Sequence, residues 1–191
     1  MKKVIIAFLI LLVSSELFSG EFSSRGMKIG VNSARFTGKD IPGKGVQSMP
    51  GFSIGGFFSY KFNERFTLQP EILFTTKGSK INTIGDIYLT NLFAYFEFPV
   101  MAKISLYPES RLKPGFICGP ALGFKYFALN DTGILEDVRG TDLGLIAGFG
   151  IEYWKISFEI RLNQGLINFD TSEDELVLKN RVISIMMGYS F

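Results

Sequence analysis

The chain contains no histidine and a single cysteine, Cys118. Without histidine, catalytic sites that depend on an imidazole base cannot form, and histidine metal sites are excluded as well. One cysteine excludes an internal disulfide and a multi-cysteine zinc site. Positive and negative side chains are nearly balanced, 20 against 18, so no concentrated basic patch indicates a nucleic-acid partner. We therefore expect no cofactor, no metal, no catalytic residues and no nucleic acid.

Long apolar runs are nearly absent, and the exception lies at the start of the chain. Val4 to Val13 is an unbroken run of ten apolar residues that follows Lys2 and Lys3 and precedes small residues. This order is the three-part pattern of a secretory signal peptide. As a helix, the run would rise about 15 Å, about half of the hydrocarbon core of a bilayer. We predict a cleaved signal peptide at 1–20 and an exported domain at 21–191.

Apolar side chains occupy every second position in much of the remaining chain, which is the pattern of a half-buried β-strand. Six segments show this alternation clearly, and they are 52–62, 66–75, 96–106, 143–153, 156–163 and 183–191. Two further segments, 27–35 and 114–126, show it less regularly. We therefore expect eight strands.

The connectors between these strands alternate in length. Tight turns are expected at Asn63-Glu64, at 108–110 and at Trp154-Lys155. Longer polar stretches separate them, at 37–50, 76–87, 128–141 and 168–177. This arrangement places all short turns at one end and all long loops at the other, as in bacterial outer-membrane barrels. The sequence predicts an all-β fold, namely an eight-stranded antiparallel up-and-down transmembrane β-barrel.

Three prolines fall inside the predicted strands, at Pro70, Pro99 and Pro120. Proline cannot donate a hydrogen bond to a neighbouring strand, and a closed barrel has no free edge where this would be harmless. We expect bulges or breaks in the hydrogen-bond ladder at these positions, or strand boundaries displaced by a few residues.

The charged residues indicate which face of the barrel meets the lipid. The apolar face of each strand is nearly free of charge, whereas six charged residues share the other face: Glu71, Glu97, Lys103, Glu152, Glu159 and Arg161. Placed in lipid, each would cost up to about 2–4 kcal/mol. We predict that they form an interior polar network and that the apolar face is outside. The alternative is a secreted lipocalin-like barrel that encloses a small apolar ligand.

An ordered series of short motifs carries a family resemblance. The segment Glu97–Lys103 resembles the E-x-P-h-h-x-K stretch of the PorT-like outer-membrane β-barrel family, and similar motifs follow at 148–152, 159–161 and 188–191. The resemblance extends over about residues 25–191. It implies an eight-stranded barrel in the outer membrane of a Gram-negative cell, without an assigned activity. PorT itself serves a secretion and gliding apparatus, a role that likeness of fold does not transfer.

The last residues of the chain resemble the last-strand signal that the barrel-assembly machinery recognises. An apolar strand that ends in an aromatic residue can pair with an open sheet edge. We predict that Tyr189 and Phe191 act as this assembly signal. In the folded protein, the same two rings would lie at the membrane interface.

These observations favour a structural or interaction protein over an enzyme. The expected partners are outer-membrane lipid, the assembly machinery during biogenesis, and an envelope or secretion partner, and we expect a monomer. The remaining catalytic alternative is a pair of carboxylates among Glu71, Glu97, Glu152 and Glu159. Because these groups are expected beside Lys103 and Arg161, we interpret them as a charge-paired core.

Overall fold

The computed structural model describes residues 21–38, 46–82, 88–131, 133–134, 139–168 and 178–191. The predicted signal peptide at 1–20 lies outside these residues, as do parts of the four long connectors. Within the described residues, no helix is long and apolar enough to cross a membrane.

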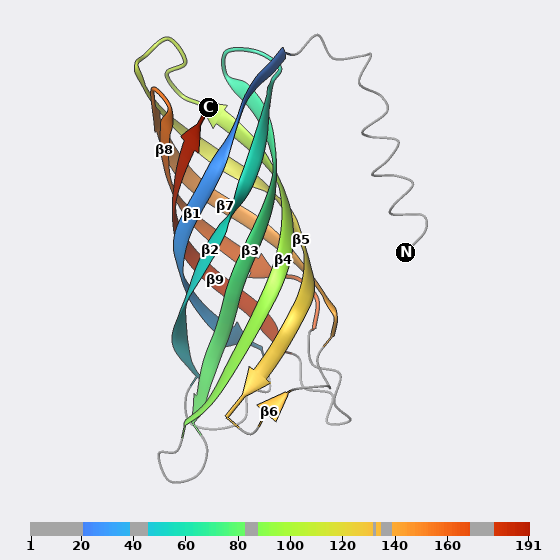
Figure 1. Cartoon of the computed structure of the whole chain (residues 1–191). Coiled ribbons are helices and arrows are strands. Elements are labelled where there is room, and N and C mark those ends of the chain that lie inside the picture. The colour runs from blue at the N-terminus through green and yellow to red at the C-terminus, as the bar shows by residue number, and fades with distance from the viewer. Residues whose placement is uncertain (1–20, 39–45, 83–87, 132, 135–138, 169–177) are drawn as a thin grey trace.

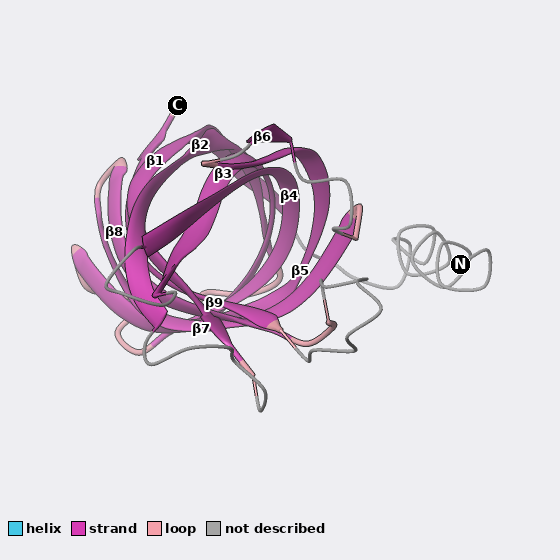
Figure 2. Ribbon diagram, turned by 90° about the horizontal axis from the view of Figure 1, so that it is seen from below, coloured by secondary structure: helices cyan, strands magenta, loops and turns pink. Residues whose placement is uncertain are grey.

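Eight long strands form a closed antiparallel barrel, as Figure 1 and Figure 2 show. The strands are β1 (Glu21–Thr37), β2 (Val46–Lys61), β3 (Phe66–Asn82), β4 (Tyr88–Ser105), β5 (Leu112–Asn130), β7 (Thr141–Tyr153), β8 (Ile156–Gly165) and β9 (Lys179–Ser190). Each long strand pairs with the next along the chain, and β1 pairs with β9 to close the ring. The two-residue strand β6 (Gly133–Ile134) pairs only with the end of β5. The predicted fold is confirmed.

The two ends of the barrel differ as predicted. The turns after β2, β4 and β7 are short and lie at the upper end in Figure 1, which we call the short-turn end. The turn after β7 contains only Trp154 and Lys155, and Trp154 has a φ of 55°, the left-handed conformation that two-residue hairpin turns require. Phe191 lies at the same end, where its N–H donates to the Arg25 carbonyl oxygen at 2.8 Å. We call the opposite end the long-loop end.

The strands are longer than predicted. Each of β1 to β5 has 16 to 19 residues. β3 runs to Asn82, through a segment predicted as loop 76–87, and β7 begins at Thr141, inside the predicted loop 128–141. Beyond the membrane boundary both faces of a strand are polar, so apolar alternation is lost although backbone pairing continues. Alternation therefore marks the membrane-spanning part of a strand rather than its full length.

The prolines interrupt the ladders without changing their register. Between β3 and β4, no pairs occur between Pro70–Val100 and Leu73–Glu97. A similar gap in the β4–β5 ladder lies next to Pro99. Since the pairing on both sides of each gap continues in one register, these are ladder breaks and not bulges. Pro120 falls inside this β4–β5 gap, as predicted, whereas on its other side it pairs with Leu145 of β7 in an uninterrupted ladder.

The apolar face is outside and the polar face is inside. Ile29, Val31, Phe158, Ile160 and Ile185 are exposed on the outer surface. Charged and hydroxyl side chains fill the lumen. The lipocalin-like alternative, with an apolar interior around a ligand, is therefore wrong.

Candidate functional site

Four charged side chains meet near the middle of the lumen, and we call them the central cluster: Lys28 of β1, Glu71 of β3, and Glu159 and Arg161 of β8. All four are buried. The Lys28 ammonium lies 2.7 Å from Glu71 Oε1 and 2.8 Å from Glu159 Oε1. The Arg161 guanidinium donates to both oxygens of Glu71, at 2.7 and 2.6 Å, and its Nε donates to Glu159 Oε2 at 2.8 Å. Two cations and two carboxylates thus form a neutral, bidentate arrangement of strong hydrogen bonds.

Lys103 and Glu152 extend this cluster towards the short-turn end. Lys103 forms an ion pair with Glu152, and its ammonium lies 3.5 Å from Glu159 Oε1. It also donates to Gln69 Oε1 at 3.2 Å, while Gln69 Nε2 donates to Glu71 Oε1 at 2.7 Å. The structure therefore brings together five of the six residues predicted for the interior network.

The sixth predicted residue, Glu97, lies in a separate group nearer the long-loop end. Its carboxylate is 2.5 Å from the Lys77 ammonium, which also lies 3.1 Å from Asp142 Oδ2. Asn180 donates to the same Asp142 oxygen at 3.0 Å, and the Lys77 ammonium lies 5.1 Å from the centre of the Tyr95 ring. We call Lys77, Glu97 and Asp142 the second cluster; its one cation is shared by two carboxylates.

Three charged residues that complete the two clusters are not identified by the sequence pattern: Lys28, Lys77 and Asp142. Lys28 lies in the less regular segment 27–35, but it alternates with Met27 and Ile29, which identifies its inward direction. Lys77 was expected in a loop because the apolar alternation of β3 ends before it. Asp142 follows the predicted loop 128–141 directly, and the apolar alternation that identifies β7 begins only at Leu143.

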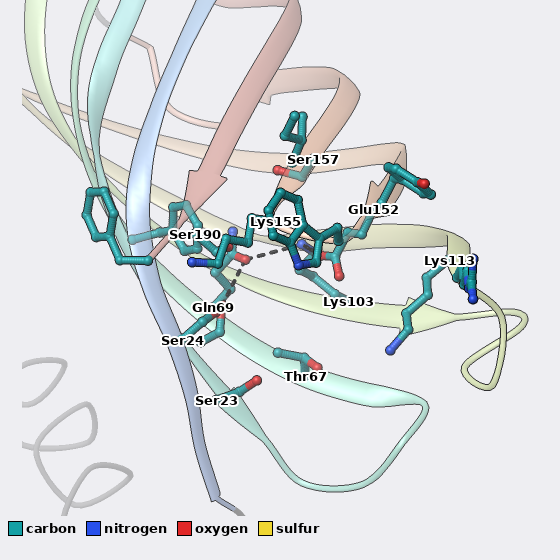
Figure 3. A pocket seen from close by; sticks show the side chains of 17 residues that line it. Ser23, Ser24, Thr67, Gln69, Lys103, Lys113, Glu152, Lys155, Ser157 and Ser190 are labelled. Atoms are coloured by element: carbon teal, nitrogen blue, oxygen red, sulfur yellow. Dashed lines mark hydrogen bonds and ion pairs between the residues drawn. The ribbon is translucent and has the colours of Figure 1, made fainter.

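A cavity of about 690 Å³ opens at the short-turn end, next to the central cluster. Its lining combines serine and threonine hydroxyls with the cations Lys103, Arg111, Lys113 and Lys155, against the single carboxylate side chain of Glu152. Figure 3 shows Lys103 joined to Gln69 and Glu152 among these residues. Within the described part of the chain, no carboxylate lies within ion-pair distance of Arg111, Lys113 or Lys155. The mouth is therefore polar and carries an excess of positive charge.

The lumen beyond this mouth is closed by packed side chains. The central and second clusters fill its middle. A group of buried apolar residues lies towards the long-loop end, consisting of Phe36, Phe93, Tyr95, Ala128 and Leu178. The carboxylates of the central cluster each accept several charged hydrogen bonds, so neither is available as a general base. Among the described residues, no group of three or more acidic or cysteine side chains could hold a metal ion.

Residues 21–171 match the family described as outer membrane protein beta-barrel domain. The chain belongs to this family. An apolar outer surface around a polar lumen is the general arrangement of outer-membrane barrels. The protein is accordingly an outer-membrane β-barrel, and its outer surface contacts outer-membrane lipid.

Solved structures of other outer-membrane barrels share this fold. Neisserial surface protein A has a TM-score of 0.55 and 15% identity, covering 90% of this chain and 99% of its own. OprG of Pseudomonas aeruginosa has a TM-score of 0.51 and 12% identity, with coverages of 91% and 99%. Ail of Yersinia pestis has a TM-score of 0.50 and 14% identity, with coverages of 90% and 100%. No curated protein matches the chain in sequence. At these identities the structures show the fold alone.

Proposed function

We propose that this outer-membrane barrel is a non-catalytic membrane anchor with a structural or interaction role, and that it engages its partner at the short-turn mouth. The observation that carries this proposal is the contrast between the two halves of the lumen. The middle is filled by charges that satisfy one another, whereas the mouth holds three cations without a described counterion.

The mouth has the composition of a protein-binding surface. Short turns face the periplasm in outer-membrane barrels. Trp154 is 82% exposed at the rim of the cavity, and Tyr153 and Phe191 are exposed beside it. Exposed aromatic residues next to cations favour binding of an acidic peptide segment, since aromatic and arginine side chains dominate the energy of such interfaces. We therefore expect a periplasmic envelope protein with an acidic docking segment.

Photocrosslinking in the intact envelope tests this proposal. A photoreactive residue at Lys155 should give one defined protein adduct, whereas the same residue at Tyr126, on the outer surface of β5, should give none. Charge removal in Arg111→Gln/Lys113→Gln should then reduce the Lys155 adduct. Equal adducts from Lys155 and Tyr126, or an adduct unaffected by the charge removal, would contradict the proposal. The identity of the adduct would establish whether the PorT-like motifs reflect a link to secretion or envelope assembly.

Because side chains fill the lumen, we propose that the barrel does not transport solutes. An eight-stranded barrel has an interior that side chains can fill, and the two ion-paired clusters occupy it here. Purified protein in a planar bilayer should give no stable conductance. A stable conductance of the wild-type protein that increases when Glu71 or Arg161 is replaced would instead identify a gated pore and would contradict the anchor role.

We further propose that Tyr189 and Phe191 form the signal for the barrel-assembly machinery. Tyr189 is an outward residue of the closing strand β9, and its ring lies 5.8 Å from that of Phe191. Both rings are exposed, so they contribute little to packing within the folded chain. Their availability on the last strand supports a role before the barrel closes.

A further inference from the structure

Two arginines face each other on the outer surface near the long-loop end. Arg35 of β1 is directly paired with Arg181 of β9, and Gln164 of β8 is paired with Arg181 on its other side. All three positions have the outward parity of their strands. Arg181 Nε donates to Gln164 Oε1 at 2.7 Å, which orients its guanidinium along the surface. We call Arg35, Arg181 and Gln164 the arginine tier.

This arrangement is unfavourable for the protein alone. Like charges directly opposite each other on neighbouring strands destabilise a sheet. Lys179, two residues before Arg181 on the same face, adds a third positive charge and is paired with Thr37. In the part of the chain that the structure describes, no carboxylate forms an ion pair with Arg35, Arg181 or Lys179. An anion from outside the protein would remove this repulsion.

The arginine tier lies at the boundary of the apolar band. On the same strands, the outward pairs towards the short-turn end are Ser33–Ile183, Val31–Ile185, Ile29–Met187 and Met27–Tyr189. From Tyr189 to Arg181 the strand extends about 26 Å, which a tilt of about 40° reduces to about 20 Å across the membrane. The apolar band of such barrels is about 25 Å tall. The tier therefore lies at the level of the headgroups, and at the long-loop end this is the outer leaflet.

We infer that the arginine tier binds the phosphate group of an anionic lipid in the outer leaflet. Two guanidinium groups present parallel N–H donors to phosphate oxygens, a geometry that lysine cannot reproduce. The hydrogen bond to Gln164 holds one of them in place before the lipid arrives. The apolar residues below the tier, Ile183 and Val31, would contact the acyl chains of the same lipid. This inference concerns the opposite end of the barrel from the proposed partner site and is independent of it.

Lipid titration of the purified, folded protein tests the inference. Binding of phosphorylated lipid A is measured by native mass spectrometry for the wild-type protein and for Arg35→Gln/Arg181→Gln. A cation near an anionic lipid surface changes the affinity by about fivefold, so the double variant should bind about 30-fold more weakly. The matched control Arg25→Gln/Arg65→Gln removes the same charge from exposed positions at the short-turn end, outside the cavity lining, and should bind as the wild type does.

Two further probes distinguish the lipid from other sources of phosphate. Dephosphorylated lipid A should bind no better to the wild type than to the double variant. Inorganic phosphate alone should not displace the lipid, because it lacks the acyl-chain contacts. Equal weakening in both double variants, or full displacement by inorganic phosphate, would overturn the inference.

Folding of each variant is checked by the shift in gel mobility on boiling. If Arg35→Gln/Arg181→Gln does not give a folded band, the single variant Gln164→Leu replaces it. That change removes the hydrogen bond that orients Arg181, together with a local bond from Gln164 Nε2 to the Gly165 carbonyl oxygen, and leaves both arginines in place. It should weaken lipid binding several-fold, and unchanged binding would count against the arginine tier as the site.

Discussion

Lys28 of β1 donates hydrogen bonds to both carboxylate oxygens of Glu159 of β8, at 2.8 and 2.9 Å, across the intervening strand β9. On β9, Gly188 pairs with Lys28 on one side and with Ser157 on the other, while Glu159 pairs with Met186, two residues before Gly188. A Cβ at Gly188 would lie 2.4 Å from Ser157 Oγ and 3.3 Å from Lys28 Cγ. The missing side chain thus provides the space through which Lys28 reaches the opposite carboxylate.

Replacing Lys28 with methionine should destabilise the barrel strongly. Removal of one partner leaves Glu71 and Glu159 buried with one cation fewer, and breaking such a buried pair costs about 3–5 kcal/mol. Urea unfolding of the detergent-folded protein, followed by the fluorescence of Trp154, measures this loss. The control Lys61→Met breaks the ion pair with Glu64, which is largely exposed, and should change stability by less than about 1 kcal/mol. An equal loss of unfolding free energy in the two variants would mean that the central cluster stabilises the barrel no more than a surface ion pair does.

The second cluster, formed by Lys77, Glu97 and Asp142, should respond unequally to the loss of its cation and of one carboxylate. Lys77→Met leaves Glu97 and Asp142 both buried without a countercharge, at an expected cost of about 3–5 kcal/mol. Asp142→Asn keeps the Lys77–Glu97 ion pair and should cost about 1 kcal/mol. The same urea titration compares the two variants. A larger loss for Asp142→Asn than for Lys77→Met would contradict the view that one cation serves both acids.

The fold could be predicted from sequence because lipid enforces a simple rule on each strand. Outward residues such as Ile160 and Ile185 must be apolar, and their inward neighbours need not be, so the period of two is visible wherever the chain crosses the membrane. The same rule stops at the membrane boundary. Lys77 therefore looked like a loop residue although β3 continues past it to Asn82.

The composition of the charged clusters could be predicted only in part. Alternation identified the inward face, and hence that Glu71 and Arg161 share the lumen. It could not indicate their height along the barrel axis, which depends on the stagger between strands. Glu97 and Glu71 have the same parity, yet they belong to different clusters, because the β3–β4 register places Glu97 opposite Leu73 and nearer the long-loop end.

Two adjacent glycines of β2 should differ in their tolerance of alanine. A Cβ at Gly55 would lie 1.9 Å from the Ile72 carbonyl oxygen and 2.8 Å from the Leu73 Cα, so β2 and β3 would have to separate. A Cβ at Gly56 would have the Gly26 carbonyl oxygen as its nearest neighbour, at 3.4 Å. Gly55→Ala should cost about 1–3 kcal/mol, whereas Gly56→Ala should be nearly neutral. The unfolding midpoints of the two variants in urea are compared. A larger loss for Gly56→Ala than for Gly55→Ala would contradict a close approach of β2 and β3 at Gly55.

A charge on the outer surface should be tolerated according to its depth in the membrane. Ile160 is an exposed residue in the middle of β8, paired with Phe149 and Ile185. Ile160→Arg should cost about 2–4 kcal/mol and prevent assembly in the envelope, whereas Leu112→Arg, at the exposed first position of β5 at the short-turn end, should cost less than about 1 kcal/mol. The heat-modifiable band of envelope fractions reports assembly. Normal assembly of Ile160→Arg would mean that this face does not contact lipid.

Removing the ring of Phe191 should slow assembly without changing the stability of the finished barrel. The backbone N–H of Phe191 bonds to Arg25, and alanine keeps that bond while removing the ring that contacts Tyr189. Because the ring is exposed, Phe191→Ala should change the free energy of unfolding in detergent by less than about 1 kcal/mol. In cells, the heat-modifiable form should appear more slowly after a pulse of synthesis. Tyr107→Ala, which removes an equally exposed ring at the same end but outside β9, should assemble at the normal rate. If both variants assembled equally slowly, the effect would reflect the loss of an interfacial aromatic residue and not of a signal in the last strand.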